Sequence, residues 1–382
     1  MKIIKILFSL DFSIPCKTNF IFFGKNSYLN LRDLKVFDNF NPLFLMSEKL
    51  NVIILFKTFF KSGFKEIKKN YLKNYIIEIK PSIIVNFTDN YYQFYEMYNF
   101  FKQRKIISVS IQNGMRTIVG DIFNLFNKKE KDLGCDYLLT MNDSTGSKYL
   151  EFINSENIVI GSIRNNKYKK IENKKKKNIV FISQFNKNII DNGFLDLKTN
   201  KIFSGENFYK AEKIVLEFLV NFCKKNSFKL VIASNGLSKF EDEYNFFSSI
   251  VNNKIDFNLI KKEDEYSTYR LCDSSEYTAF IESTIGYESF SRKNKILGFS
   301  IRGNFLEQTQ GHSFCWPNLK ISEGPCWTSK NDINEFERIG NFILNSDINT
   351  WNRIFEQYLN KIMVYDENNL ALNNFIKKIK SN

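Results

Sequence analysis

The sequence predicts an α/β protein of two Rossmann-like domains that face each other across a cleft, each with a parallel sheet between layers of helices. Three observations predict this fold. Short apolar runs alternate with longer stretches of helical spacing, which is typical of βαβ units. The alternation starts again after a strongly basic segment in the middle of the chain. The length of 382 residues also favours two domains.

The first domain is expected over residues 1–165. Clusters of β-branched and aromatic residues predict its strands at 2–10, 19–24, 51–56, 83–87, 106–112, 137–142 and 157–162. Residues 62–79 and 91–104 have helical spacing. The N-terminal run resembles a signal peptide superficially. Lys5 and Asp11 interrupt it, however, and no small-residue cleavage site follows, so a first strand is the better interpretation.

Residues 166–178 are expected to form an exposed linker, because they are strongly basic and lack apolar periodicity. The second domain, 179–345, is predicted to hold strands at 179–184, 229–234, 256–260, 278–283 and 295–300. Its predicted helices lie at 208–225, 239–252 and 264–273, and the first of these has the clearest apolar face. From residue 331 onward we expect two or three helices, including 350–363 and 367–380.

The balance of charges favours anionic partners. Lysine and arginine number 55 against 41 aspartates and glutamates, a net charge of +14. Such a chain suits nucleotides, phospholipid headgroups, lipid-linked pyrophosphates or nucleic acid. No helix-turn-helix, zinc or RNA-recognition signature is present, so a nucleic-acid partner is not expected. The richness in Lys, Asn, Ile and Phe is also typical of A/T-rich coding, in which case spread-out charge is background.

Cysteine and hydropathy patterns point to a cytoplasmic protein without a metal site. The six cysteines are scattered without a CxxC pair, and the chain has a single histidine. Free thiols in a reducing cytosol are therefore expected, with no zinc cluster. The sequence contains no run of about 18 apolar residues, so no transmembrane segment is expected. Peripheral contact with the inner membrane through basic and aromatic surface stays open.

The most informative stretch is 278–300, TAFIESTIGYESFSRKNKILGFS, which predicts strand, turn, helix and strand. Ser283 and Thr284 would offer hydroxyls and backbone N–H groups at a helix N-terminus, an arrangement that suits phosphate. Gly286 lies in the same turn. Glu288 would lie about one turn inside the helix, within reach of a hydroxyl pair such as that of a ribose. The alternative is an ordinary N-cap with a nearby acid.

Polar side chains also follow other predicted strands, at the edge where parallel sheets bind ligands. Asp89 follows strand 83–87, and QNGMR, residues 112–116, ends strand 106–112. Ser183, Asn235 and Glu282 follow strands of the second domain. These groups are able to hold a phosphorylated or polyhydroxylated ligand. Polar residues at strand ends are also common simply because loops contact water.

Two of these positions, and a histidine elsewhere in the chain, have specific chemical interpretations. Arg116, after the tight turn that Asn-Gly permits, is a candidate phosphate clamp, although NG alone indicates only a turn. Asp89 is a candidate general base, with an Asx-turn or helix cap as the alternative. His312 lies in a loop rich in Gly, Pro and Trp, where a lone histidine is more often structural. The motifs GxSxG, GxGxxG and GxxxxGK[ST] are absent, which argues against a serine hydrolase, a dehydrogenase and a P-loop ATPase.

Several islands between about 80 and 370 resemble one family. TDNYYQFYEMYNFFKQRKIISVSIQNGMR is similar to a "DN…QNGxR" segment of bacterial surface-carbohydrate (O-antigen or capsule) biosynthesis proteins. IESTIGYESFSRKNKILGF resembles their nucleotide-side motif "ST-x-G-x-E…K", which is also similar to that of CDP-glycerol-type transferases and of GT-B glycosyltransferases. FCWPNLKISEGPCWTS, followed by Trp351, resembles the C-terminal loop of the same group.

The resemblance implies a GT-B-like fold and a metal-independent glycosyltransferase without a tightly bound cofactor. The second domain would hold a nucleotide-sugar donor, with Ser283 and Thr284 on its phosphate and Glu288 on its ribose. Gly286, Ser183 and Asn235 are further donor-side candidates. The first domain would hold a saccharide or lipid-linked saccharide acceptor, and the cleft residues on this side would be Gln112, Asn113, Gly114 and Arg116. The helices of 346–382 would pack back on the cleft.

One departure from the family pattern leaves the chemistry open. Related transferases often have His-Gly where this chain has Asn113-Gly114, and an amide cannot take a proton. Asp89, His312 and Glu282 are then alternative catalytic bases, and loss of catalysis is another outcome. A glycerol-phosphate-type transferase, a sugar-nucleotide epimerase and a non-catalytic carbohydrate-assembly protein stay open beside the glycosyltransferase.

Overall fold

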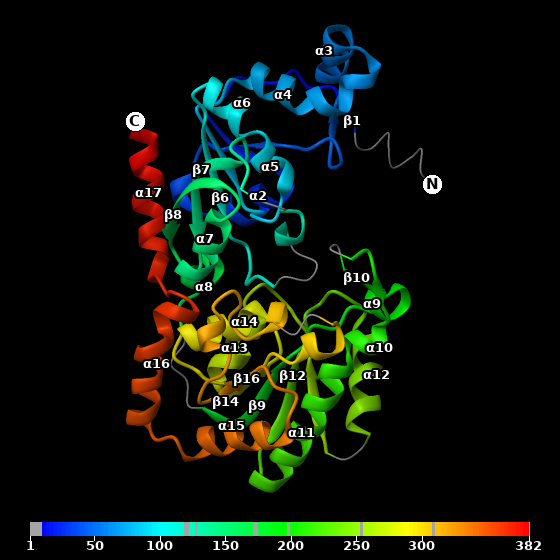
Figure 1. Cartoon of the computed structure of the whole chain (residues 1–382), viewed down its shortest axis with the longest axis vertical. Coiled ribbons are helices and arrows are strands. Elements are labelled where there is room, and N and C mark those ends of the chain that lie inside the picture. The colour runs from blue at the N-terminus through cyan, green and yellow to red at the C-terminus, as the bar shows by residue number, and fades with distance from the viewer. Residues whose placement is uncertain are drawn as a thin grey trace.

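Two parallel sheets organise the protein. The computed structural model describes residues 10–117, 122–126, 129–170, 175–196, 199–252, 255–307 and 310–381. In this part of the chain each of the two larger sheets has six strands, and every strand pairing within them is parallel. The two sheets belong to two domains that lie end to end in Figure 1. Parallel strands need crossover connections, and helices supply most of them.

The N-terminal domain has the strand order β3-β2-β5-β6-β7-β8. The strands are β2 (Phe20–Phe23), β3 (Asn41–Leu43), β5 (Ile83–Asn86), β6 (Ile107–Ile111), β7 (Gly134–Thr140) and β8 (Asn154–Val159). Alternate residues of a strand enter different cores: Ile21 and Phe23 contribute to one cluster, and Phe22 to the other. One core includes α4 (Ile67–Ile79), α5 (Tyr92–Glu96) and α6 (Tyr98–Gln103), and the other includes α2 (Gly24–Leu31). Both faces of the sheet are therefore buried, which explains the continuous apolar runs.

The C-terminal domain has the order β13-β12-β9-β14-β15-β16. Its strands are β9 (Lys176–Ile182), β12 (Lys229–Ala233), β13 (Phe257–Ile260), β14 (Ser275–Phe280), β15 (Lys295–Phe299) and β16 (Trp327–Thr328). Its helices include α11 (Lys210–Asn226), α12 (Phe240–Val251), α13 (Ser267–Ser274), α14 (Thr284–Ser291) and α15 (Ile333–Asn345). The predicted amphipathic helix at 208–225 corresponds to α11, whose apolar face is buried in the core.

The last two helices connect the domains. Helix α16 (Ile348–Ile362) packs beside α14 of the C-terminal domain. Helix α17 (Leu370–Ser381) then buries Leu372, Phe375 and Ile376 in a core of the N-terminal domain. Figure 1 shows this return of the chain as the orange and red helices along one side of the molecule. The last helix therefore packs against the N-terminal domain.

The structure corrects the strand expected at 51–56, which is the start of helix α3 (Val52–Ser62). Asn51 caps this helix, because its Oδ1 accepts from the N–H of Ile54 at 3.0 Å. An apolar run of this length does not distinguish helix from strand by periodicity. The short edge strands β3 and β16 were not predicted, and Pro42 in β3 is typical of an edge.

Two predicted segments lie partly outside the described residues. Of the strand expected at 2–10, the structure describes only Leu10, which begins β1 (Leu10–Asp11) and pairs with β4 (Leu50–Asn51). Of the expected linker at 166–178, residues 176–178 already belong to β9. Within the described residues, no helix has both the length and the apolar character needed to cross a bilayer.

Candidate functional site

The two stretches that the sequence singles out touch at the interface between the domains. The loop that follows β6 places the N–H of Met115 3.0 Å from Oγ1 of Thr284, at the start of α14. A Cβ at Gly114 would lie 3.2 Å from the same oxygen, so a glycine permits the close approach. The C-terminal ends of β6 and β14 therefore meet across the interface, as the sheet-edge rule predicts for a ligand site.

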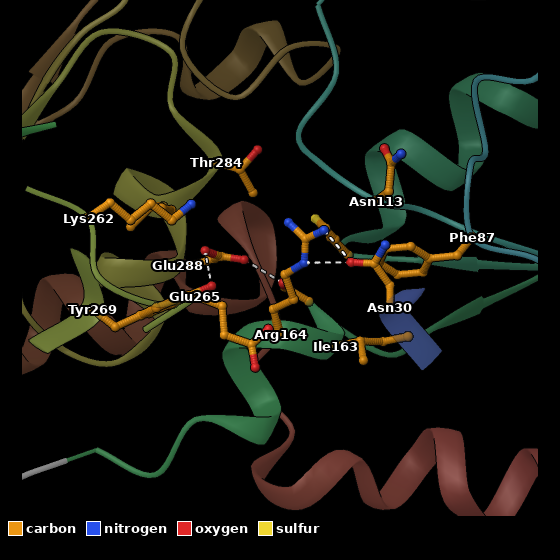
Figure 2. A pocket seen from close by; sticks show the side chains of 13 residues that line it. Asn30, Phe87, Asn113, Ile163, Arg164, Lys262, Glu265, Tyr269, Thr284 and Glu288 are labelled. Atoms are coloured by element: carbon orange, nitrogen blue, oxygen red, sulfur yellow. Dashed lines mark hydrogen bonds between the residues drawn. The ribbon is translucent and has the colours of Figure 1, made fainter. Parts of the chain in front are cut away.

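A cavity of about 300 Å³ lies beside this contact (Figure 2). The N-terminal domain lines it with Asn30, Phe87, Asn113, Met141, Ser162, Ile163 and Arg164, and the C-terminal domain with Lys262, Glu265, Tyr269, Thr284, Ile285 and Glu288. The lining thus combines two cationic side chains, two carboxylates and several hydroxyl and amide groups. This mixture, enclosed between two domains, is typical of a site for a small polar ligand.

Glu288 is the most organised acceptor in the cavity. It is 3% exposed, and its Oε1 and Oε2 accept from the hydroxyls of Ser162 at 2.5 Å and of Tyr269 at 2.7 Å. Both bonds are drawn in Figure 2. Burial, and then the charge of Glu288, raise the pKa of Tyr269 well above its ordinary value, so the phenol stays a donor. Each carboxylate oxygen has a further lone pair for a ligand hydroxyl.

Two cations flank this carboxylate. Arg164 donates from Nε to Oδ1 of Asn30 at 3.2 Å, and its guanidinium lies 5.8 Å from the ring centre of Phe87. Lys262 is exposed and makes no ion pair with any described residue. Figure 2 shows both side chains beside Glu288, on opposite sides of the cavity. The pair supplies positive charge where an anionic ligand would lie.

Ser283, expected on the donor phosphate, and Gly286, a further donor-side candidate, both lie outside the lining of this cavity. Ser283 occupies the N-cap position of α14, but its side chain makes no capping bond. Gly286 does not line the cavity. A Cβ there would lie 2.1–2.4 Å from carbons of the Phe280 ring, so the glycine lets α14 pack onto β14. We conclude that Gly286 positions the helix by close packing.

Gly286→Ala is therefore expected to lower the free energy of unfolding by about 1–3 kcal/mol, the usual cost of an extra methyl group in a filled core. Urea denaturation followed by circular dichroism measures the change. Glu337→Ala, at an exposed position of α15, is the control and should change stability by less than about 0.5 kcal/mol. An unfolding midpoint equal to that of the wild type would contradict the packing role of Gly286.

Asp89 and Arg116 form a buried ion pair. Oδ1 of Asp89 lies 2.5 Å from Nη2 of Arg116 and accepts from the N–H of Asn113 at 3.0 Å. Its Oδ2 accepts from the hydroxyl of Tyr149 at 2.8 Å. The carboxylate is 0% exposed and does not line the cavity. In this structure, therefore, Asp89 and Arg116 serve to hold the loop after β6 in place.

Gln112 also helps to hold the loop after β6 in place. Its Oε1 accepts from the N–H of Met141, and its Nε2 donates to the carbonyl of Gly114, each at 2.8 Å. Among the residues of QNGMR, Asn113 lines the cavity. Its Oδ1 also accepts from Nη2 of Arg116. The motif thus builds a rigid loop that presents one amide side chain to the ligand space.

Ser183 and Asn235 lie at the C-terminal ends of β9 and β12, outside the lining of the cavity. The hydroxyl of Ser183 donates to Oε1 of Glu243, whose Oε2 accepts from Ser234 at 2.5 Å. Nδ2 of Asn235 donates to the carbonyl of Phe185 at 2.7 Å. These bonds satisfy polar groups within the C-terminal domain. The structure therefore does not join the two residues to the group around Glu288.

Glu282 and His312 are brought together, 30 residues apart in the chain. Nδ1 of His312 lies 2.5 Å from Oε1 of Glu282, and Oε2 accepts from Nη1 of Arg302 at 2.6 Å. Burial works against ionisation of Glu282, but the adjacent His312 and Arg302 outweigh it and hold its pKa below the ordinary value. The Glu282 carboxylate is thus held from two sides, by His312 and by Arg302. Arg302 is itself held by an ion pair with Glu212 on α11.

This arrangement suits proton transfer. When Glu282 accepts the Nδ1–H of the neutral imidazole, the lone pair is left on Nε2 of His312. Nε2 is buried and has no hydrogen-bond partner among the described residues. His312 and Glu282 do not line the cavity of Figure 2. Glu282 is nevertheless only two residues before Thr284, at the same edge of the sheet.

Sequence reasoning missed much of the cavity. Arg164 lies two residues after the strand expected at 157–162, so the same strand-end rule could have identified it. Tyr269 lies inside helix α13, and no local pattern distinguishes it from a core tyrosine. Asn30, on α2, comes close only because the chain folds back. Within the described residues, no group of three or more His, Cys, Asp or Glu side chains is arranged to hold a metal ion.

Comparison with known proteins gives a family and a fold. A family model described as "putative O-antigen biosynthesis protein" matches residues 109–380. No curated protein sequence matches significantly. The Methanocaldococcus jannaschii UDP-GlcNAc 2-epimerase, solved with UDP-GlcNAc and UDP, is 10% identical, with a TM-score of 0.52 over 94% of this chain and 99% of that one. S. aureus MnaA, solved with UDP, is 13% identical, with a TM-score of 0.51 over 94% and 96%. These likenesses confirm the expected GT-B-like fold.

Proposed function

The chain belongs to a family of O-antigen biosynthesis proteins, and from that premise we propose that it transfers a sugar from a nucleotide-sugar donor to a surface-polysaccharide precursor. The observation that carries the proposal is the cavity between the domains, with Glu288, Thr284, Arg164 and Lys262 in its lining. The Glu288 carboxylate accepts hydrogen bonds from the two ribose hydroxyls, whose adjacent O–H groups match its two oxygens. The Thr284 hydroxyl and the two cations contact the diphosphate.

The same groups would help the nucleoside diphosphate to leave when the bond to the sugar breaks. Negative charge develops on the diphosphate as the bond to the sugar breaks. Fixed positive side chains and hydroxyls in a site of low dielectric stabilise this charge without reorganisation. Arg164 is already held in place by Asn30, and Thr284 by its contact with the loop after β6. These residues would therefore supply the stabilisation with little loss of side-chain entropy on binding.

We assign the general base to His312, with Glu282 as the residue that orients it. Of the three sequence candidates, Asp89 has its carboxylate enclosed by Arg116, Asn113 and Tyr149. Glu282 has one oxygen directed at Nδ1 of His312 and the other at the guanidinium of Arg302. His312 alone keeps a basic atom without a partner among the described residues. Nε2 would take the proton of the acceptor hydroxyl, and the Glu282 carboxylate would stabilise the imidazolium that forms.

Glu288→Gln is expected to weaken binding of the nucleoside diphosphate by about 10- to 100-fold, because hydrogen bonds to a charged acceptor contribute about 1.5–3 kcal/mol. A thermal-shift screen of UDP, GDP, CDP and their sugars first identifies the nucleotide, since a ligand at a hundred times its Kd adds about 2.7 kcal/mol of stability. Calorimetry then gives Kd for wild type and variant.

Two controls separate ligand contact from domain packing. Ser162→Ala removes the hydrogen bond that Ser162 donates to Glu288 across the domain interface but leaves the carboxylate, so nucleotide affinity should stay within about threefold of wild type. Glu263→Gln neutralises an exposed acid next to Lys262 in the chain and should leave the nucleotide affinity unchanged. Equal affinity of Glu288→Gln and wild type would refute the ribose assignment.

Incubation with UDP-GlcNAc alone tests epimerisation, because a C2 epimer formed without release of nucleotide identifies that reaction.

A further inference from the structure

A helical hairpin projects from the N-terminal domain at the end away from the C-terminal domain (Figure 1). It consists of α3 (Val52–Ser62), the turn η2 (Phe64–Glu66) and the start of α4 (Ile67–Ile79). Ile54 and Thr58, one helical turn apart, form the buried face of α3. The Thr58 hydroxyl accepts from Nδ2 of Asn74 on α4 at 3.1 Å. This packing fixes which side of α3 faces outward.

The outward side is rich in exposed phenylalanine. Phe60 and Phe64 are each 81% exposed, Phe56 58% and Phe59 41%. Phe56 and Phe60 are one turn apart, about half a turn away from Ile54 and Thr58. Beside them lies an apolar hollow of about 510 Å³, whose lining includes Phe56, Phe59 and Phe64. Soluble proteins seldom expose a continuous apolar surface of this kind unless it binds something.

Lysines alternate with these phenylalanines along the chain, and Lys65 and Lys68 line the same hollow. Residues 52–69 contain five lysines and one glutamate. Lys57 is paired with Glu78 at 2.8 Å, whereas Lys61, Lys65, Lys68 and Lys69 are exposed and have no ion pair with a described residue. Lysine is depleted in the cores of protein–protein interfaces. Phenylalanine mixed with lysine on one helical surface is instead typical of segments that lie in the interface of an anionic membrane.

We propose that this hairpin docks the protein on an anionic lipid bilayer. The phenylalanine rings enter the boundary between headgroups and acyl chains, and the exposed lysines contact lipid phosphates. Because α3 packs on α4 and α4 belongs to a core of the N-terminal domain, the hairpin would carry that domain to the membrane surface. The proposal depends on this surface alone, and it is independent of the sugar-transfer assignment.

The test is sedimentation of the full chain with vesicles. Wild type should bind phosphatidylcholine vesicles that contain about 30% phosphatidylglycerol, and bind pure phosphatidylcholine at least about tenfold more weakly. Phe60→Ser with Phe64→Ser should lower the affinity at least about tenfold. Lys61→Gln with Lys65→Gln should lower it about 30-fold, because each lysine near an anionic surface contributes about 1 kcal/mol. Circular dichroism melting verifies that each variant is folded.

Matched controls lie elsewhere on the surface. Leu237→Ser with Ile348→Ser removes two exposed apolar side chains, and Lys224→Gln with Lys225→Gln removes two exposed lysines. Both control pairs should bind vesicles like wild type. Wild-type affinity in the Phe60/Phe64 double variant would overturn the proposal. So would sedimentation velocity showing a wild-type dimer that this variant converts to monomer without any vesicle binding, because the hairpin would then be an interface between copies.

Discussion

Asp89→Asn is expected to lower the free energy of unfolding by about 3–5 kcal/mol, one of the two largest effects predicted for a single substitution in this chain. The change leaves the guanidinium of Arg116, 5% exposed, without its 2.5 Å counter-charge. Removing one partner of a buried ion pair is costly because the other charge has already lost its hydration. Chemical denaturation monitored by fluorescence or circular dichroism measures the loss.

The design of this experiment also decides whether Asp89 is a base. The double variant Asp89→Asn, Arg116→Gln removes both charges and should lose less stability than the two single variants added together. Glu151→Gln removes one partner of the exposed pair with Lys148 and should cost less than about 1 kcal/mol. A folded Asp89→Asn protein with wild-type stability and no activity would show instead that Asp89 acts on the substrate.

His312→Ala is expected to reduce kcat for sugar transfer by about 10²- to 10⁴-fold, the usual contribution of a general base. Nucleotide affinity should change little, because His312 does not line the cavity that holds Glu288. The measurement is release of nucleoside diphosphate from the donor identified by the binding screen. Kd by calorimetry is measured on the same protein samples.

Glu282→Gln separates orientation from base chemistry. It keeps the size of the side chain but removes the charge that faces Nδ1 of His312 and Arg302. A fall in kcat with unchanged nucleotide Kd, accompanied by a shifted pH profile, is expected if the carboxylate stabilises the imidazolium. A His312→Ala protein that is folded and transfers sugar within about twofold of the wild-type rate would exclude His312 as the base.

Much of the fold could be predicted because local sequence determines it. The runs at 83–87, 106–112 and 229–234 are strands because both faces of a covered parallel sheet are apolar. The run at 51–56 is equally apolar, but Asn51 caps a helix there, and the choice depends on α4 packing against it. Because a strand covered on both faces buries all of its side chains, the wrong assignment predicted no exposed phenylalanines at this position. In the helix, Phe56, Phe59 and Phe60 are exposed.

The candidate site could be predicted only in part. The segments 112–116 and 282–288 were identified because each follows a strand, and they do touch through Met115 and Thr284. Which of their polar groups faces the cavity was not readable from position. Glu288, Thr284 and Asn113 line it, whereas Gln112 and Arg116 bond within the protein.

The sequence by itself determined the two α/β domains, the parallel sheets and the family to which the chain belongs, because these depend on periodicity and on short motifs. Only the tertiary structure decided the partner of each polar group. Asp89 meets Arg116, Glu282 meets His312, and Glu288 meets Ser162 across the domain interface. Such pairs join residues 27, 30 and 126 positions apart. Long-range packing alone brings them into contact, so no local pattern records them.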